Sequence, residues 1–178
     1  MRNIISAVAV LTVAGALSAC AGAPKTYNQT SLISDPQSYY AYGASERDLK
    51  LVVVGNPFSQ PANQVGEALA SEMDAAQVGP GTHFTPNPGP SAREGFRVVL
   101  AFNGADGEHE LCGAAADAKT LPPSSNVHVT AALCEQGRLL TSVEGQVADV
   151  SGVNDPRVSS LMKQVALGLF PNSAVWKN

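Results

Sequence analysis

The first 20 residues constrain this chain most, because they decide how much of it folds and in which compartment. Arg2 is the only charged residue before an uncharged run of 14 apolar and small residues, Ile4 to Leu17. A spanning helix needs about 20 such residues, so this run is too short for a permanent membrane helix. A basic head, a short apolar stretch and small residues before a cleavage site are typical of a secretory signal peptide.

The end of this run carries a more specific motif, Leu17-Ser18-Ala19-Cys20. It resembles the lipobox of bacterial lipoprotein precursors at all four positions. The resemblance implies cleavage between Ala19 and Cys20, followed by a diacylglyceryl thioether and an N-linked acyl chain such as palmitate on Cys20. The next residue is Ala21 rather than aspartate, which in this family favours the outer membrane. We expect a lipid-anchored protein that faces the periplasm; an ordinary secretory signal with a free Cys20 is the alternative.

Cleavage would leave 159 residues, which is the length of one domain with a sizeable core. Arg2 leaves with the signal, so ten basic and 15 acidic side chains remain, and the net charge is −5. Phosphate backbones are bound by clustered lysine and arginine, so nucleic acid is not an expected partner. The same charge disfavours electrostatic attachment to anionic headgroups, and the lipid on Cys20 must hold the protein on the membrane.

Two further cysteines, Cys112 and Cys134, remain in the exported chain. Cysteines in an oxidising compartment usually form disulfides, so we expect these two to be bonded to each other. The alternatives are two free thiols, a redox pair or half of a metal site. No Cys-x-x-Cys motif is present, so a thioredoxin-like redox site is absent.

Three segments follow from the sequence. Residues 1–19 are the signal peptide, residues 20–49 the lipidated cysteine and a flexible polar tether, and residues 50–178 a single globular domain with a C-terminal helix and tail. A tether of this length has a reach of about 30 Å as a coil, which would hold the domain clear of the membrane. Three tyrosines in the tether, Tyr39, Tyr40 and Tyr42, are expected to dock on the domain, with docking on a partner as the alternative.

Hydrophobic periodicity predicts four strands and two helices in the globular segment. The strands lie at 51–54, 96–102, 127–134 and 138–146, and Thr82 to Thr85 is able to add a short edge strand. The helices begin near Pro61 and Pro156, the second after an Asn154-Asp155 cap. The predicted class is α+β: a two-layer sandwich with a mixed four-stranded sheet and two helices on one face. The order is strand, helix, strand, strand, strand, helix.

Two pairings are expected within this sheet. The strand–helix–strand crossover makes strands 51–54 and 96–102 parallel, and a tight turn at Gly137 makes strands 127–134 and 138–146 an antiparallel hairpin. In element order alone, the domain is similar to small envelope lipoproteins that assist transporters and assembly machines.

Motifs of catalysis are missing from the sequence: there is no Gly-x-Ser-x-Gly elbow and no phosphate loop. A zincin-like start at His109-Glu110 lacks its second histidine, because Gly113 stands there. The densest group of metal-competent side chains is expected to be a solvated acidic loop, with a weak divalent-ion site as the alternative: Asp106, Glu108, His109 and Glu110. His109, Cys112, His128 and Cys134 together could supply the four ligands of a zinc site. Such a site is not expected, because it would need reduced thiols in an oxidising compartment. Thus no catalytic residue, metal or cofactor is predicted.

The function predicted from these features is that of a non-enzymatic interaction or assembly module in the bacterial envelope, with an envelope protein as partner. The alternative is a small-ligand or metal binder, or an enzyme, with a cleft near His83 and His109. Arg97 and Arg138 are expected to pair with acidic neighbours rather than with a substrate. A pocket with convergent polar groups would favour the alternative, whereas an exposed apolar patch or an open sheet edge would favour the interaction module.

Overall fold

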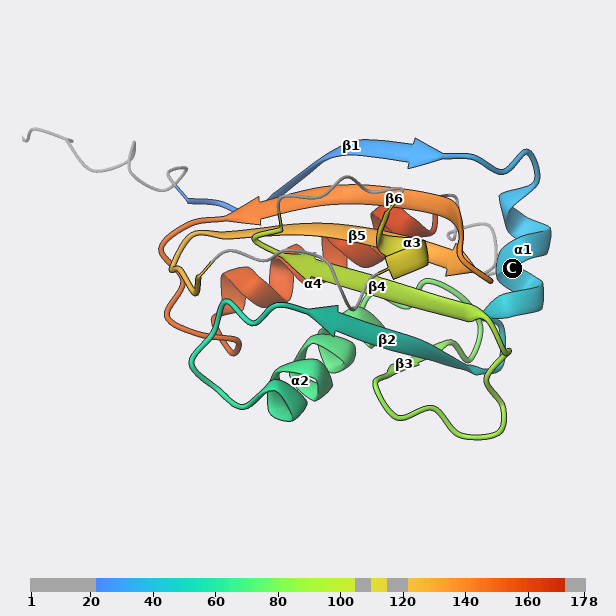
Figure 1. The fold of residues 1–178 in the computed structure, drawn as a ribbon, viewed down its shortest axis with the longest axis horizontal. Helices are drawn as coiled ribbons and strands as arrows, with labels where there is room; N and C mark the ends of the chain where they lie inside the picture. Colours follow the sequence, from blue (N-terminus) through green and yellow to red (C-terminus); the bar gives the residue numbers. More distant parts are fainter. Residues whose placement is uncertain (1–21, 105–109, 115–121, 172–178) are drawn as a thin grey trace, which may run out of the picture.

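A single mixed sheet of six strands organises the fold in the computed structural model, which describes residues 22–104, 110–114 and 122–171 (Figure 1). The spatial order is β1-β6-β5-β4-β2-β3. The strands are β1 (Lys25–Ser31), β2 (Asp48–Val54), β3 (His83–Thr85), β4 (Phe96–Phe102), β5 (Val127–Glu135) and β6 (Arg138–Val147). The helices are α1 (Pro36–Gly43), α2 (Ala62–Asp74), α3 (Leu111–Ala114) and α4 (Pro156–Leu169).

The predicted four-stranded sheet with two helices was therefore wrong, although the α+β class is correct. The four central strands and the two long helices were anticipated, and β3 falls within the segment named as a short edge strand. The structure has three elements that were not predicted: β1 at one edge of the sheet, helix α1, which follows β1 in the chain, and the short helix α3.

The pairing of the central strands follows the prediction. β2 is parallel to β4, whereas β4, β5 and β6 are successively antiparallel. The β5–β6 hairpin turns at Gln136 and Gly137, which both have positive φ, at 47° and 87°. A two-residue hairpin turn with positive φ at both positions matches the right-handed twist of the strands it joins.

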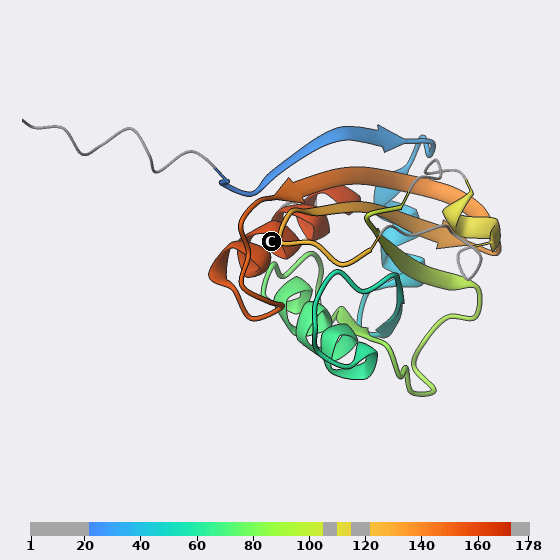
Figure 2. The same ribbon diagram turned by 60° about the vertical axis from the view of Figure 1, so that its left-hand side comes forward.

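The main core lies between the sheet and the helices α2 and α4, which pack on the same face (Figure 2). Each helix presents apolar residues at helical spacing, and the most deeply buried are Val65, Leu69, Met73, Val158, Leu161 and Val165. α4 starts as predicted, because the Asp155 carboxylate accepts the Arg157 backbone N–H at 2.9 Å and Pro156 occupies the first turn. Burial of each such side chain stabilises the fold by about 1.5 to 3 kcal/mol.

A second, smaller core lies on the other face of the sheet. Here α3 covers apolar side chains of β2, β4, β5 and β6: Val54, Val99, Ala101, Ala132, Cys134 and Leu139. Leu139 reaches this face because the β5–β6 register shifts between Leu133 and Cys134. The shift puts Leu140 in the main core. Regular alternation along this strand would put Leu139 on the same face as Thr141, and the shift breaks that alternation.

The predicted flexible tether is also corrected, because β1, α1 and the start of β2 lie within residues 20–49. β1 pairs antiparallel with β6, from Lys25 opposite Gln146 to Ser31 opposite Thr141. Its side chains are exposed or only half-buried, so the strand carries no apolar period that a sequence reading can detect. Backbone pairing with β6 therefore makes this segment a strand, despite its polar composition.

The three tyrosines of this segment lie on α1. Tyr40 is buried against Phe170, with ring centroids 4.8 Å apart, and donates its hydroxyl to the Leu169 carbonyl at 3.1 Å. Tyr39 and Tyr42 also contact the domain, through Arg138 and Phe96, which confirms the predicted docking. In the part of the chain that the structure describes, no helix combines the length and apolar character needed to cross a bilayer.

Candidate functional site

The two cysteines of the folded chain form the predicted disulfide, Cys112–Cys134, which ties α3 to β5. Their Cα atoms are 5.4 Å apart and both residues are fully buried. The bonded sulfurs cannot act as thiolate ligands, so the four-residue zinc set containing them is not available. The lipidation and cleavage residues, Ala19 and Cys20, lie outside the described residues.

The acidic loop also falls largely outside the described part of the chain, because Asp106, Glu108 and His109 lie there. Glu110 is described and is exposed beside α3. Over residues 22–104, 110–114 and 122–171, no three side chains of histidine, cysteine, aspartate or glutamate are grouped closely enough to hold a metal ion.

His83 lies at the surface, in an ion pair with the end of α2. Its Nδ1 atom lies 2.6 Å from the Asp74 carboxylate, whose other oxygen accepts the Phe84 backbone N–H at 2.6 Å. The His83 side chain is 60% exposed, so this pair fastens β3 to the end of α2 at the surface. His109, the other residue named for the predicted cleft, lies outside the described residues, so that cleft stays a prediction.

The two arginines named from the sequence have different partners. Arg138 pairs with Glu135 at 2.5 Å, as predicted, and also donates to the Tyr39 hydroxyl at 3.1 Å. Arg97 instead donates to the carbonyl of Cys112 and has no acidic partner among the described residues; pairing with an acidic neighbour stays a prediction, because part of the adjoining acidic loop lies outside them. Arg97 holds the backbone of α3 in place beside the disulfide.

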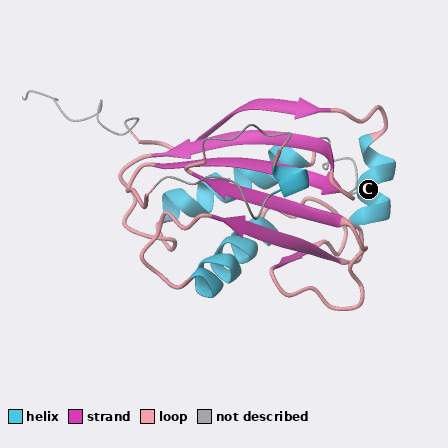
Figure 3. Cartoon of the chain, in the orientation of Figure 1, coloured by secondary structure: helices cyan, strands magenta, loops and turns pink. Residues whose placement is uncertain are grey.

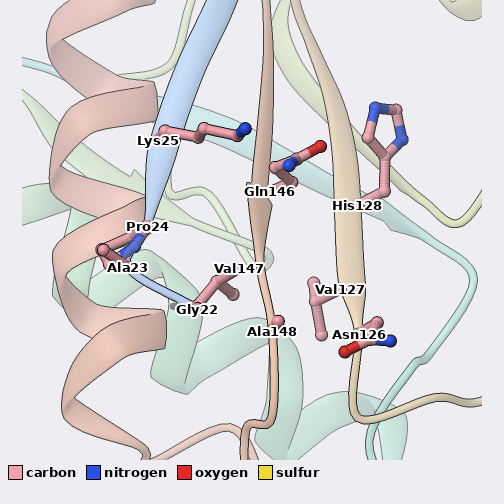
Figure 4. A pocket seen from close by; sticks show the side chains of 10 residues that line it. All are labelled: Gly22, Ala23, Pro24, Lys25, Asn126, Val127, His128, Gln146, Val147 and Ala148. Atoms are coloured by element: carbon pink, nitrogen blue, oxygen red, sulfur yellow. The ribbon is translucent and has the colours of Figure 1, made fainter. Parts of the chain in front are cut away.

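A cavity opens at the end of the sheet that is closest in sequence to Cys20, where β1 starts (Figure 4). We call it the anchor-end pocket; its volume is about 500 Å³. Three segments line it: the start of β1, the start of β5 and the end of β6. The lining residues are Gly22, Ala23, Pro24, Lys25, Asn126, Val127, His128, Gln146, Val147 and Ala148. None of the ten is acidic, although the chain as a whole carries a net negative charge.

Strand pairing brings the polar side chains of this pocket together. Lys25 lies opposite Gln146 in the β1–β6 ladder, and Gln146 lies opposite His128 in the β5–β6 ladder. Side chains opposite one another project from the same face of a sheet, so these three form one row across three strands. Figure 4 shows the Lys25 side chain extending from β1 toward Gln146.

The acceptor atoms of the two pocket amides are already used. Tyr27 donates its hydroxyl to Gln146 Oε1 at 3.2 Å, and the Asp149 backbone N–H donates to Asn126 Oδ1 at 3.3 Å. Each amide therefore has its NH₂ group left over. Among the described residues, Lys25 Nζ has no hydrogen-bond or carboxylate partner. The pocket thus offers one ammonium and two amide donors.

A small polar cluster borders the pocket on β6 and β1. Glu144 accepts from Asn28 at 3.2 Å and lies 3.3 Å from His128 Nε2. Tyr27 lies against His128, with ring centroids 6.2 Å apart. Burial raises the pKa of the Tyr27 hydroxyl, and the nearby Glu144 carboxylate adds to this effect. The cluster fixes the position of His128 at the pocket wall.

A second surface lies at the opposite end of β1, beside α1. We define the distal surface by five residues: Leu32, Tyr39, Tyr42, Arg93 and Arg138. Leu32 and Tyr42 are each 54% exposed, which is unusual for large apolar side chains. Arg93 stacks on the Tyr42 ring at 4.5 Å from its centroid, and Arg138 lies 5.3 Å from that of Tyr39. Tyr39 and Tyr42 share one face of α1 because they are three residues apart.

Neither the anchor-end pocket nor the distal surface was predicted as a site. Both depend on β1 and α1, which the sequence reading assigned to a tether. The one signal that bore on them was the group of three tyrosines, since aromatic residues are unusual in a solvated linker.

Comparison with known proteins finds similarity only at the level of distant solved structures. No family model and no curated protein matches the chain. Among solved structures, the PelC dodecamer from Paraburkholderia phytofirmans is similar at 17% identity and a TM-score of 0.45, covering 83% of this chain and 98% of that one. A leucine-to-methionine variant of that PelC, also a dodecamer, gives 16% identity and a TM-score of 0.44 with the same coverage. Likeness at this level transfers neither fold nor function to the chain.

Proposed function

We propose that this protein is an outer-membrane lipoprotein, anchored through Cys20, that acts as a non-enzymatic interaction module on the periplasmic side. The distal surface is the observation that carries the proposal. It combines exposed tyrosine and leucine with arginine, and tyrosine and arginine are the residue types that most often dominate protein–protein binding energy.

The position of this surface relative to the anchor supports the proposal. Gly22, the first described residue, is two residues after Cys20, a span of at most about 7 Å. β1 then runs for seven residues, about 23 Å, before the chain reaches Leu32 and α1. The start of β1 and helix α1 lie at opposite ends of the molecule (Figure 3). An anchored domain would therefore hold its first residues at the bilayer and present the distal surface away from it. A partner in the periplasm could reach that surface.

The stacked arginines make this surface better ordered than isolated side chains. The Arg138 guanidinium is held by both Glu135 and the Tyr39 hydroxyl, and these hydrogen bonds raise its pKa. Side chains that are already held in place lose less conformational entropy on binding. Tyr42 is similarly held between Arg93 and Phe96.

Lipidation is tested by feeding cells an alkyne-labelled palmitate. Cys20→Ser should abolish incorporation of the label into this protein, because the acyl chains are expected on that cysteine and its N-terminal amine. The Cys112→Ala/Cys134→Ala double variant retains Cys20 and should remain labelled. Label incorporation that is unaffected by Cys20→Ser contradicts the lipobox.

The distal surface is tested separately by in-cell photo-crosslinking. A photoreactive amino acid at position 42 should give a discrete crosslinked product, whereas the same amino acid at position 67, exposed on α2, should not. Tyr42→Ala should then weaken the affinity for that partner by at least about thirtyfold, as expected for a tyrosine at the centre of an interface, and less of the partner should be recovered. Equal crosslinking from both positions, or none from position 42, refutes the assignment of this surface.

A further inference from the structure

We propose that the anchor-end pocket binds the phosphate group of a membrane phospholipid, through Lys25, Gln146 and Asn126. The choice of a lipid as the source of this phosphate rests on the proposed anchor at Cys20. The chemistry of the pocket, by contrast, is independent of the anchor.

The pocket favours an anion because the free groups of its lysine and its two amides are donors; the remaining ring nitrogen of His128 is the one side-chain acceptor of its lining. Lys25 has no partner among the described residues, and the carbonyl oxygens of Gln146 and Asn126 are occupied by Tyr27 and Asp149. The remaining amide NH₂ groups can only donate. An ammonium with two amide donors and no lining carboxylate suits a phosphate oxyanion, which offers several acceptors in a small volume.

His128 adds to the wall of this site without competing for the same role. Its Nε2 atom is engaged with Glu144 at 3.3 Å, which leaves Nδ1 as the remaining ring nitrogen. Glu144 is the nearest carboxylate described here, but it is occupied by Asn28 and His128 and does not line the pocket.

Location favours a phospholipid as the source. Gly22 lines the pocket and is two residues from Cys20, so the pocket is within about 7 Å of contour length of the acylated residue. The headgroup region of one leaflet is of comparable thickness, about 5 to 8 Å. The anchor would thus place the opening among headgroups and raise their local concentration greatly.

The net charge of −5 that is expected for the chain after signal cleavage does not conflict with an anion site in this pocket. Net charge governs long-range attraction to an anionic surface, which falls off within about 8 Å at physiological ionic strength. A chain already held at the bilayer by acyl groups does not need such attraction. Binding then depends on direct contacts at the pocket, where the charge-assisted hydrogen bond of one lysine is sufficient to hold a phosphate weakly.

The experiment is native mass spectrometry of the purified full-length lipoprotein, which measures how much bound phosphatidylglycerol the protein retains. The protein is kept in an uncharged, phosphate-free detergent to which phosphatidylglycerol is added. Lys25→Gln should weaken lipid retention by at least about tenfold, the effect of losing one charge-assisted hydrogen bond. Gln146→Glu keeps the acceptor for Tyr27 but replaces the donor with a negative charge, and should abolish retention. Lys50→Gln is the matched control: it removes the same charge from an exposed side chain of β2, which is separated from β6 by β5 and β4, and it should bind lipid as the natural protein does.

The same spectra keep the two proposals apart, because the mass of the polypeptide itself reports whether Cys20 is acylated. An unacylated chain that still retains phosphatidylglycerol through Lys25 refutes the anchor but not the pocket. Retention unchanged in both Lys25→Gln and Gln146→Glu refutes the pocket, whatever the state of Cys20. Inorganic phosphate that displaces the lipid at equal concentration refutes a lipid headgroup as the ligand.

Discussion

Loss of the Cys112–Cys134 disulfide should lower the free energy of unfolding by about 3 kcal/mol. The bridge closes a loop with a sequence separation of 22 residues. In the chain-entropy model, closing a loop of this length lowers the entropy of the unfolded chain and thereby stabilises the folded protein by about 3 kcal/mol at 25 °C. For a domain of this size the melting temperature should fall by about 6 to 12 °C.

The assay is urea unfolding of the mature protein, followed by circular dichroism, with and without a thiol reductant. Cys112→Ala/Cys134→Ala is the matched variant, because alanine fills most of each buried site without adding a polar group. It should unfold at the urea concentration of the reduced natural protein and should not respond to the reductant. The double serine variant should be less stable still, since each buried hydroxyl without a partner costs about 1 to 3 kcal/mol.

The loss should also be visible locally. α3 is held by the disulfide, by its packing in the second core and by Arg97, whose guanidinium donates to the Cys112 carbonyl. Amide exchange in α3 should accelerate more than exchange in the β5–β6 hairpin. If the reduced protein and the double alanine variant both unfold within about 1 kcal/mol of the oxidised protein, the loop-constraint reasoning fails.

Three further predictions concern single residues. The hydrogen bonds from Arg157, with those from the backbone N–H groups of Arg157 and Ser151, hold the pKa of Asp155 well below its usual value of about 3.9. Asp155→Ala should therefore cost about 1 to 2 kcal/mol in urea unfolding at pH 7, a cost that shrinks as the pH falls below 4; a constant difference across that range would contradict the ion pair. Burial raises the pKa of Tyr40 to about 12, so its stabilisation should be lost between pH 10 and 12. In an absorbance titration of the natural protein, one tyrosine should ionise near pH 12, after the others. That last step should be missing from the titration of Tyr40→Phe. Gly145→Ala would place a Cβ atom 2.8 Å from Leu161 Cδ1 and 3.3 Å from Val165 Cγ2, between β6 and α4. Such overpacking should destabilise the protein by about 1 to 3 kcal/mol in the same urea assay, and an unchanged midpoint would show that α4 can move aside.

The elements with a strong apolar period were predictable from the sequence. β4 alternates regularly and β2 is a continuous β-branched run, so both strands follow from the pattern alone. α4 has an Asp155 cap, a proline in its first turn and an apolar stripe, each of which is a local signal. The disulfide was predicted from the expected export of the chain and from the two cysteines that remain when Cys20 is assigned to the lipobox, with no knowledge of the fold.

β1 and α1 were not predictable in the same way. β1 is an edge strand with polar, partly exposed side chains, and its stability comes from hydrogen bonds to β6, which is more than 100 residues away in sequence. α1 is eight residues long, below the length at which an isolated helix is stable, and depends on burial of Tyr40 against Phe170. No window of local sequence contains these partners.

The sequence by itself predicted a compartment and a lipobox, and it determined the cysteine pair, the central strands and the long helices. Apart from the cysteine pair, each of these depends on residues close together in the chain. Only the tertiary structure decided the edges of the sheet and therefore both candidate sites. Lys25, His128 and Gln146 form one row because three strands from distant parts of the chain pair in a particular register. A shift of one residue in that register would turn their side chains to the opposite face and remove the pocket, and local sequence does not encode that register.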